Sequence, residues 1–179
     1  MSESLISLNM FVEYRELRRN TLKGKAVILM GSKSDLEFCR KIAEHLKSFG
    51  VECEFRVASA HKTPLKVLEI LRKYEDSEVV YITVAGRSNA LSAFVDAHTT
   101  KPVIACPPYS EKFAGADIYS SLRVPSGIGS VVTIEPEAAA IAAAKILAVK
   151  DQELAKRVRD YQERKREEIA SADKALRTG

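Results

Sequence analysis

One short stretch of the chain combines a hydroxyl, an imidazole and an ammonium group. It has the sequence S-A-H-K-T-P at residues 59–64 and contains Ser59, His61 and Lys62. An imidazole can accept or release a proton at neutral pH, and an ammonium group attracts an anion. These residues predict acid/base chemistry on a negatively charged small molecule, with His61 as the proton carrier. A solvated loop with one exposed histidine is the alternative.

The residues around this stretch predict a loop between a strand and a helix. An apolar, β-prone run at 51–57 precedes it, and leucines recur at three- to four-residue spacing after it. Pro64 suits the first helical turn because its missing N–H has no intrahelical partner there, and Thr63 is expected to be the N-cap. In parallel α/β sheets, ligands bind at the carboxyl ends of strands. The loop is therefore expected to face a ligand.

A second loop, with the sequence G-S-K-S-D at residues 31–35, has the features of a phosphate site. It follows an apolar run at 26–30, which is typical of a strand buried on both faces, and it opens a helix. The free N–H groups at a helix N-terminus attract an anion, Ser32 adds a hydroxyl, and Asp35 is expected to accept hydrogen bonds from ribose. The spacing matches neither G-x-x-x-x-G-K-[ST] nor G-x-G-x-x-G. An ordinary helix capped by Ser34 or Asp35 is the alternative.

The strand, loop and helix pattern recurs along the chain. Further strands are expected at 78–84, 102–106 and 130–134. Between them, A-G-R-S-N at residues 85–89 opens another helix. This alternation predicts an α/β fold with a doubly wound, five-stranded parallel sheet and helices on both faces. The loops then converge at one edge of the sheet, which brings Gly86 and Ser88 toward His61.

The composition divides the chain into a central domain and two ends. The strand and helix pattern occupies residues 24–149, and residues 1–23 form an N-terminal extension with a partly amphipathic helical pattern. Within the domain, the Pro- and Gly-containing connection 107–129 is expected to be a lid or a binding loop. Residues 150–179 predict a charged C-terminal helix with an apolar seam. The seam is expected to lie either on another subunit or on its own domain.

The composition also argues against several classes of protein. Of the 179 residues, 46% are apolar and 29% are charged, and Lys and Arg alternate with Asp and Glu, so a nucleic-acid partner is not expected. There is no run of ~18 apolar residues and no apparent signal peptide, so neither a membrane span nor a location outside the cytoplasm is expected. Cys39, Cys53 and Cys106 form no C-x-x-C and are expected to be reduced core thiols. His45 and His98 lie in predicted helices, which leaves no set of metal ligands around His61.

Four motifs in series resemble the phosphoribosylaminoimidazole carboxylase (PurE) family. They are the three loops above and L-R-V-P-S-G at 122–127, and their order and spacing agree from about residue 27 to residue 147. The resemblance implies a flavodoxin-like three-layer sandwich, an extra C-terminal helix and a homo-octamer in which that helix is an interface element. It also implies a cytoplasmic enzyme of purine biosynthesis that binds a small-molecule nucleotide and carbon dioxide. Neither ATP, biotin, a metal nor another cofactor is implied.

The resemblance also assigns roles to particular residues. Carried onto matching positions, it implies that the nucleotide is bound by Ser32, Asp35, Ser59, Lys62, Gly86 and Ser88. His61 would be the catalytic proton shuttle.

Two branches of the family differ in their motifs and in their reaction. One isomerises the N-carboxylated ribonucleotide and typically carries S-A-H-R-T-P with A-G-G-A-A-H. The other carboxylates aminoimidazole ribonucleotide directly with carbon dioxide and typically carries S-A-H-K with A-G-R-S-N. With Lys62 and A-G-R-S-N at 85–89, this chain is similar to the second branch, although Ser92, Ala93 and His98 depart from its usual residues. The isomerase reaction, or a non-catalytic nucleotide-sensing module with the same fold, is the alternative.

Overall fold

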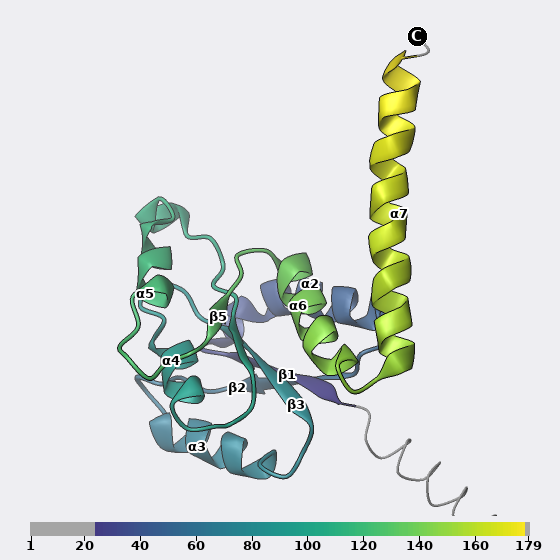
Figure 1. Ribbon diagram of the computed structural model, residues 1–179. Helices are drawn as coiled ribbons and strands as arrows, with labels where there is room; N and C mark the ends of the chain where they lie inside the picture. Colours follow the sequence, from purple (N-terminus) through teal and green to yellow (C-terminus); the bar gives the residue numbers. More distant parts are fainter. Residues whose placement is uncertain (1–23, 178–179) are drawn as a thin grey trace, which may run out of the picture.

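The structure is a computed structural model that describes residues 24–177 (Figure 1). The predicted N-terminal extension, 1–23, lies outside the described residues. The five strands are β1 (Lys25–Met30), β2 (Cys53–Val57), β3 (Val79–Val84), β4 (Val103–Ala105) and β5 (Val131–Val132). They pair in parallel in the order β2-β1-β3-β4-β5. This order is that of a doubly wound, flavodoxin-like sheet, so the predicted fold class is confirmed.

Helices cover both faces of this sheet. They are α2 (Leu36–Ser48), α3 (Pro64–Lys73), α4 (Ala90–Asp96), α5 (Tyr119–Leu122), α6 (Pro136–Ala148) and α7 (Gln152–Arg177). Three short 3-10 helices also occur, η1 (Lys33–Asp35), η2 (Glu111–Phe113) and η3 (Ala116–Ile118). No helix between residues 24 and 177 combines the length and the apolar character needed to cross a lipid bilayer.

The strand β1 is buried on both sides because its side chains alternate between two separate cores. Ala26, Ile28 and Met30 pack with α2, α6 and the start of α7. Val27 and Leu29 point the other way and pack with α3 and α4. A strand between two layers of helices needs apolar residues at every position, since neither face meets water. The continuous apolar run in the sequence therefore becomes the centre of the molecule.

The helix α6 is the small-residue helix of the sequence, and it packs against both α2 and α7. Its buried residues are Ala139, Ala140, Ala143 and Ala144. Alanine side chains let neighbouring backbones approach closely, so one helix can contact the sheet and two other helices together. The small side chains therefore allow α6 to be buried within the chain.

The C-terminal helix α7 packs on its own domain only at its beginning. Leu154 is buried, and the rings of Tyr161 and Phe49 meet edge to face with their centroids 5.1 Å apart. Beyond this contact α7 extends away from the domain (Figure 1), and Ile169 and Leu176 are 73% and 86% exposed. The apolar seam therefore follows the folded-back alternative in its first part, and the interface role of its second part stays a prediction.

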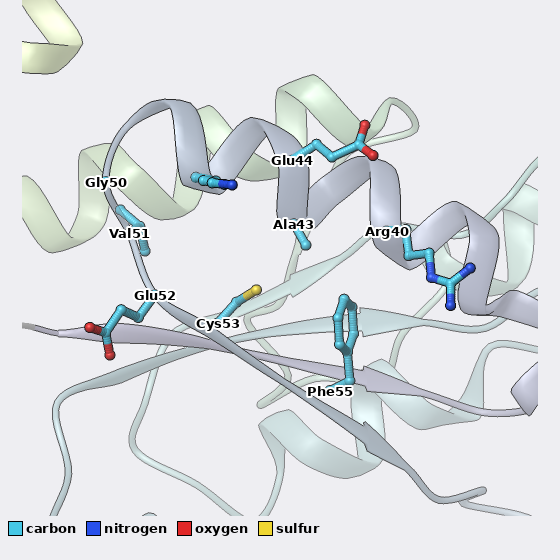
Figure 2. A pocket seen from close by; sticks show the side chains of 9 residues that line it. Arg40, Ala43, Glu44, Gly50, Val51, Glu52, Cys53 and Phe55 are labelled. Atoms are coloured by element: carbon cyan, nitrogen blue, oxygen red, sulfur yellow. The ribbon is translucent and has the colours of Figure 1, made fainter.

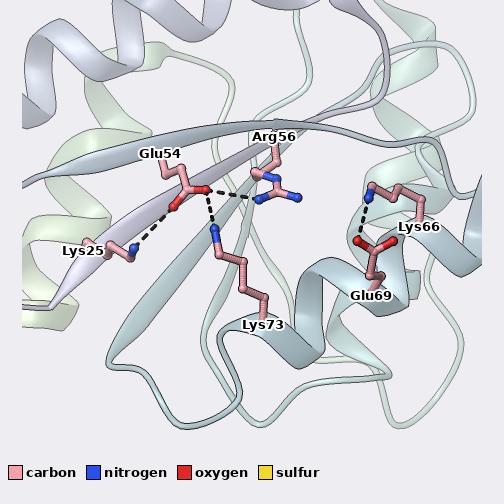
Figure 3. A network of polar contacts seen from close by, with 6 residues as sticks. All are labelled: Lys25, Glu54, Arg56, Lys66, Glu69 and Lys73. Atoms are coloured by element: carbon pink, nitrogen blue, oxygen red, sulfur yellow. Dashed lines mark hydrogen bonds and ion pairs between the residues drawn. The ribbon is translucent and has the colours of Figure 1, made fainter.

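A cluster of charges covers the exposed edge of the sheet at β2 (Figure 3). The Glu54 carboxylate lies 3.4 Å from Lys25 Nζ, 3.2 Å from Arg56 Nη1 and 3.0 Å from Lys73 Nζ. The nearby Tyr74 hydroxyl and the hydrogen bonds from these three cations lower the pKa of Glu54 to about 2. Charged side chains on an edge strand prevent another strand from pairing there. The cluster thus protects the edge and ties β1, β2 and α3 together.

We expect Glu54→Gln to destabilise the fold by about 1 kcal/mol at pH 7, because three cations lose their shared partner in a solvent-screened setting. The stabilisation by Glu54 is fully present above its ordinary pKa of 4.5 and is lost as the pH falls toward 2. Urea unfolding of the parent protein and of Glu54→Gln, at pH 7 and at pH 3, measures this contribution to the free energy of unfolding. The difference in stability should shrink at the lower pH.

The matched control is Glu69→Gln, which removes a single contact, 2.6 Å between Glu69 Oε1 and Lys66 Nζ on α3 (Figure 3). Its effect should be smaller at both pH values. A Glu54→Gln protein as stable as the parent at pH 7 would show that the charge cluster contributes nothing.

Candidate active site

The loops that follow β1, β2, β3 and β4 line one cavity of about 590 Å³ at the carboxyl edge of the sheet. It lies where the chain order reverses from β2-β1 to β3, the place at which open parallel sheets bind ligands. Its lining includes all seven predicted site residues, namely Ser32, Asp35, Ser59, His61, Lys62, Gly86 and Ser88. The structure thus brings these residues together, and their individual roles stay predictions.

The loop after β1 is organised by the hydroxyl of Ser32. Ser32 Oγ accepts hydrogen bonds from the backbone N–H of Ser34 at 3.3 Å and from the Ser34 hydroxyl at 2.9 Å. Ser32 is therefore the N-cap of η1. Asp35 occupies the N-cap position of α2, but its side chain makes no capping hydrogen bond. The predicted cap position at Asp35 is confirmed, but the capping hydrogen bond is made by Ser32, because a 3-10 turn begins earlier than the apolar pattern indicates.

The carboxyl group of Asp35 is partly buried in this loop. Burial raises its pKa above the ordinary value, and hydrogen bonds from the Ser32 backbone and the Ser34 hydroxyl partly offset that rise. An ionised carboxylate can only accept hydrogen bonds, so its natural ligands are hydroxyl groups. As the pH falls through the raised pKa, Asp35 loses this purely accepting form.

The loop after β2 is closed by a hydroxyl bridge between Ser59 and Thr63. Thr63 Oγ1 accepts the Ser59 N–H at 2.9 Å and lies 3.3 Å from the Ser59 carbonyl oxygen, to which it donates. Ser59 Oγ in turn accepts the Lys62 N–H at 3.3 Å. Thr63 is at the N-cap position of α3, as predicted, but its side chain does not cap the helix, because the hydroxyl is engaged by Ser59. The turn leaves His61 and Lys62 exposed on the cavity wall.

The loop after β3 has an unusual backbone conformation. Arg87 has a φ of 61°, in the left-handed region that side chains disfavour. Asn89, two residues later, is buried and is the N-cap of α4, where its Oδ1 accepts the Ser92 N–H at 3.2 Å. Gly86 and Ser88 therefore line the cavity from a turn that is fixed at its far end.

Nine further residues line the cavity, and four of them lie outside the three loops that the sequence analysis singled out. These four are Leu91 on α4 and Pro108, Tyr109 and Ser110 after β4. The connection 107–129 had been expected to form a lid or a binding loop, and the structure places its first residues in the cavity. The sequence could have predicted the place of Pro108, Tyr109 and Ser110. They closely follow the strand expected at 102–106, so they must emerge at the same edge of the parallel sheet as the other three loops.

The thiols and a second hollow do not contribute to this site. Burial raises the pKa of Cys39 to about 12 and that of Cys106 to about 11, so both thiols stay protonated, and all three cysteines are free. A hollow of about 500 Å³ lies between α2 and β2 (Figure 2), with Ala43, Val51, Cys53 and Phe55 among its lining residues and without a histidine. Among residues 24–177, no three His, Cys, Asp or Glu side chains lie close enough together to hold a metal ion.

Comparison with known proteins assigns this geometry to a family. Residues 25–168 match the family described as AIR carboxylase. The chain belongs to the AIR carboxylase family. It is therefore an enzyme of that family, and the resemblance found in the loop motifs is confirmed.

Individual relatives agree with this assignment. A phosphoribosylaminoimidazole carboxylase of Archaeoglobus fulgidus is 60% identical over 153 residues, which cover 86% of this chain and 85% of the relative. The crystal structure of Treponema denticola PurE is 50% identical, covers 86% of this chain and 98% of that one, and superposes with a TM-score of 0.83. A human bifunctional protein that includes a phosphoribosylaminoimidazole carboxylase is 45% identical over 124 residues, and the match covers 29% of its length.

We expect Thr63→Val to loosen the loop after β2 without changing the rest of the fold. Valine has nearly the same volume but cannot accept the Ser59 N–H. Loss of one hydrogen bond of about 1 kcal/mol should speed amide exchange at Ser59 about fivefold. Hydrogen exchange with mass spectrometric or NMR detection measures this, with Thr100→Val between α4 and β4 as the control. Unchanged protection at Ser59 would mean that the hydroxyl bridge does not hold the loop.

Proposed function

We propose that this protein carboxylates 5-aminoimidazole ribonucleotide with carbon dioxide, giving 4-carboxy-5-aminoimidazole ribonucleotide, and catalyses the reverse decarboxylation, in the biosynthesis of purines. The observation that carries the proposal is one cavity that holds His61 and Lys62 beside the polar groups of the first and third loops. Membership of the AIR carboxylase family and relatives named for this activity support it. The residues S-A-H-K at 59–62 and A-G-R-S-N at 85–89 support the direct use of carbon dioxide.

The polar lining matches the parts of such a nucleotide. The Lys62 ammonium supplies positive charge for the phosphate, and Ser32 adds a hydroxyl donor beside the helix start. Asp35 accepts hydrogen bonds from the ribose hydroxyls. Ser59, with Gly86 and Ser88 across the cavity, is left to contact the imidazole ring and its amino group.

Carbon–carbon bond formation requires carbon dioxide that has not been hydrated to bicarbonate by water. The amino group makes the aminoimidazole ring electron-rich, so its C4 attacks the carbon of carbon dioxide, and one C–O π pair moves to oxygen. The apolar side chains of Ala60, Ala85 and Leu91 line the same cavity and provide a surface that suits an apolar gas.

A proton must then leave C4 so that the ring regains its aromatic character. His61, in its neutral form, accepts that proton and later passes it to water, which its exposed position permits. Substrate and carbon dioxide give the carboxylated product and one proton, so the scheme balances without an oxidant, a reductant or an activated phosphate. No cofactor or metal is part of the proposal.

The proposal extends to assembly, organisation and location. Residues 24–149 form the catalytic domain, residues 150–179 form an interface helix, and the assembly is a homo-octamer in the cytoplasm without a nucleic-acid partner. The exposed Ile169 and Leu176 on the projecting part of α7 support an interface there, because apolar side chains gain stability when a neighbour covers them.

We expect His61→Asn to stop turnover while nucleotide binding is nearly retained. Asparagine keeps a polar side chain of similar size but cannot take up the C4 proton, and removal of a general base lowers kcat by roughly 100-fold or more. Steady-state kinetics give kcat, and calorimetry with aminoimidazole ribonucleotide gives the affinity. A His61→Asn enzyme with the parent's kcat would rule out the assigned role.

The carboxyl donor is tested by two parallel reactions of the unmodified protein. We expect product from aminoimidazole ribonucleotide with dissolved carbon dioxide or bicarbonate, and none from the N-carboxylated isomer kept free of carbon dioxide. Absorbance of the carboxylated ring follows both reactions. Product from the isomer alone would replace the proposal with the isomerase reaction. Tight nucleotide binding without product in either reaction would indicate a sensing module.

A further inference from the structure

The third loop of the cavity is held by a segment about thirty residues further along the chain. Asp117 in η3 accepts the backbone N–H of Arg87 at 2.9 Å through its Oδ2. A side-chain carbon at Gly86 would lie 3.6 Å from the same Asp117 oxygen. The left-handed residue of the loop and the glycine before it therefore lie directly against this carboxylate.

The hydroxyl of Ser120 in α5 holds the same loop from a second point. Ser120 Oγ accepts the backbone N–H of Asn89 at 2.9 Å. It also lies 3.0 Å from the Arg87 carbonyl oxygen and 2.7 Å from the Asp117 carbonyl oxygen, and its single proton is shared between these two acceptors. One hydroxyl thus links the backbone on both sides of Ser88.

The support behind Ser120 is buried and rigid. Asn89 and Ser121 are each 2% exposed, and Asn89 Nδ2 donates to Ser121 Oγ at 3.0 Å. Buried polar groups that are paired in this way are costly to separate. The loop therefore rests on η3 through Asp117 and on α5 through Ser120 and Ser121, while neither Asp117 nor Ser120 lines the cavity.

We propose that Asp117 and Ser120 are positioning residues for nucleotide binding, which they support by fixing the Gly86–Asn89 turn. This rests on the proposed function, in which Gly86 and Ser88 contact the ring. A residue with a side chain disfavours the left-handed conformation that Arg87 adopts. Without the bonds to Asp117 and Ser120, the peptide groups on both sides of Ser88 lose their hydrogen-bond partners, and the direction of its hydroxyl is less restricted.

The variants separate the hydroxyl and the carboxylate from the bulk of each side chain. Ser120→Ala removes the bridge, and Ser120→Thr restores a hydroxyl. Asp117→Ala removes the acceptor, whereas Asp117→Asn keeps an oxygen for the Arg87 N–H. The control is Ser48→Ala at the end of α2, whose Oγ donates to the His45 carbonyl oxygen at 2.7 Å, remote from the cavity lining.

We expect Ser120→Ala and Asp117→Ala each to raise the dissociation constant and the KM for aminoimidazole ribonucleotide about tenfold, with kcat changed less than about threefold. Ser120→Thr and Asp117→Asn should stay within about threefold of the parent, and Ser48→Ala should not differ from it. Amide exchange at Arg87 and Asn89 should quicken in the two alanine variants. Calorimetry, steady-state kinetics and hydrogen exchange supply the three measurements.

The exchange experiment needs no ligand, so it separates this inference from the proposed reaction. A parent protein that binds the nucleotide without turnover would refute the reaction and leave the positioning role to be judged from affinity and exchange. Alanine variants with the parent's affinity and the parent's exchange at Arg87 and Asn89, and only a lower melting temperature, would overturn the positioning role. Faster exchange with unchanged affinity would overturn it as well, because the turn would then be irrelevant to binding.

Discussion

The site depends on the parallel pairing of β1 with β2 on one side and with β3 on the other. The register aligns Met30 with Val57 and with Val84, so the three strands end at one level. The Gly31 N–H donates to the Val84 carbonyl oxygen at 2.9 Å, and the Ala58 N–H donates to that of Met30 at 3.0 Å. A slip by one residue would turn every side chain of a strand to the opposite face. The two apolar cores therefore fix the register, and the register places the three loops side by side.

Beyond the strand ends, the loops are shaped by hydrogen bonds between side chains and backbone. Ser32 caps a 3-10 turn, Thr63 bonds back to Ser59, and Ser120 joins the two ends of the third loop. Such bonds satisfy backbone groups that the sheet no longer pairs. The side chains of His61 and Lys62 remain exposed on the cavity wall. The chemistry-bearing side chains thus stand on turns that other residues hold.

The two helical layers serve different purposes around this common edge. The layer with α3 and α4 begins directly after the second and third loops, so its helix starts carry the cavity wall. The layer with α2 and α6 continues into α7, whose far part leaves the domain (Figure 1). Small residues on α6 allow that close packing, and the edge strand β2 is covered by charge on one side. The molecule therefore separates the edge that carries the cavity from the end at which α7 projects.

The sequence by itself determined the order of strands and helices, the parallel sheet and the seven cavity residues, because each follows from neighbouring residues: apolar runs, helical spacing and the loops that follow strands. The family was indicated separately, by the resemblance of four motifs. The sequence located Thr63 and Asp35 at N-cap positions, but it did not predict that neither side chain makes the capping hydrogen bond, since a hydroxyl or carboxyl has several nearby partners of similar energy. Only the tertiary structure brought Tyr109 into the cavity and Ser120 against Arg87. Those contacts join residues far apart in the chain. Their distances depend on how the folded chain packs, which no local sequence pattern predicts.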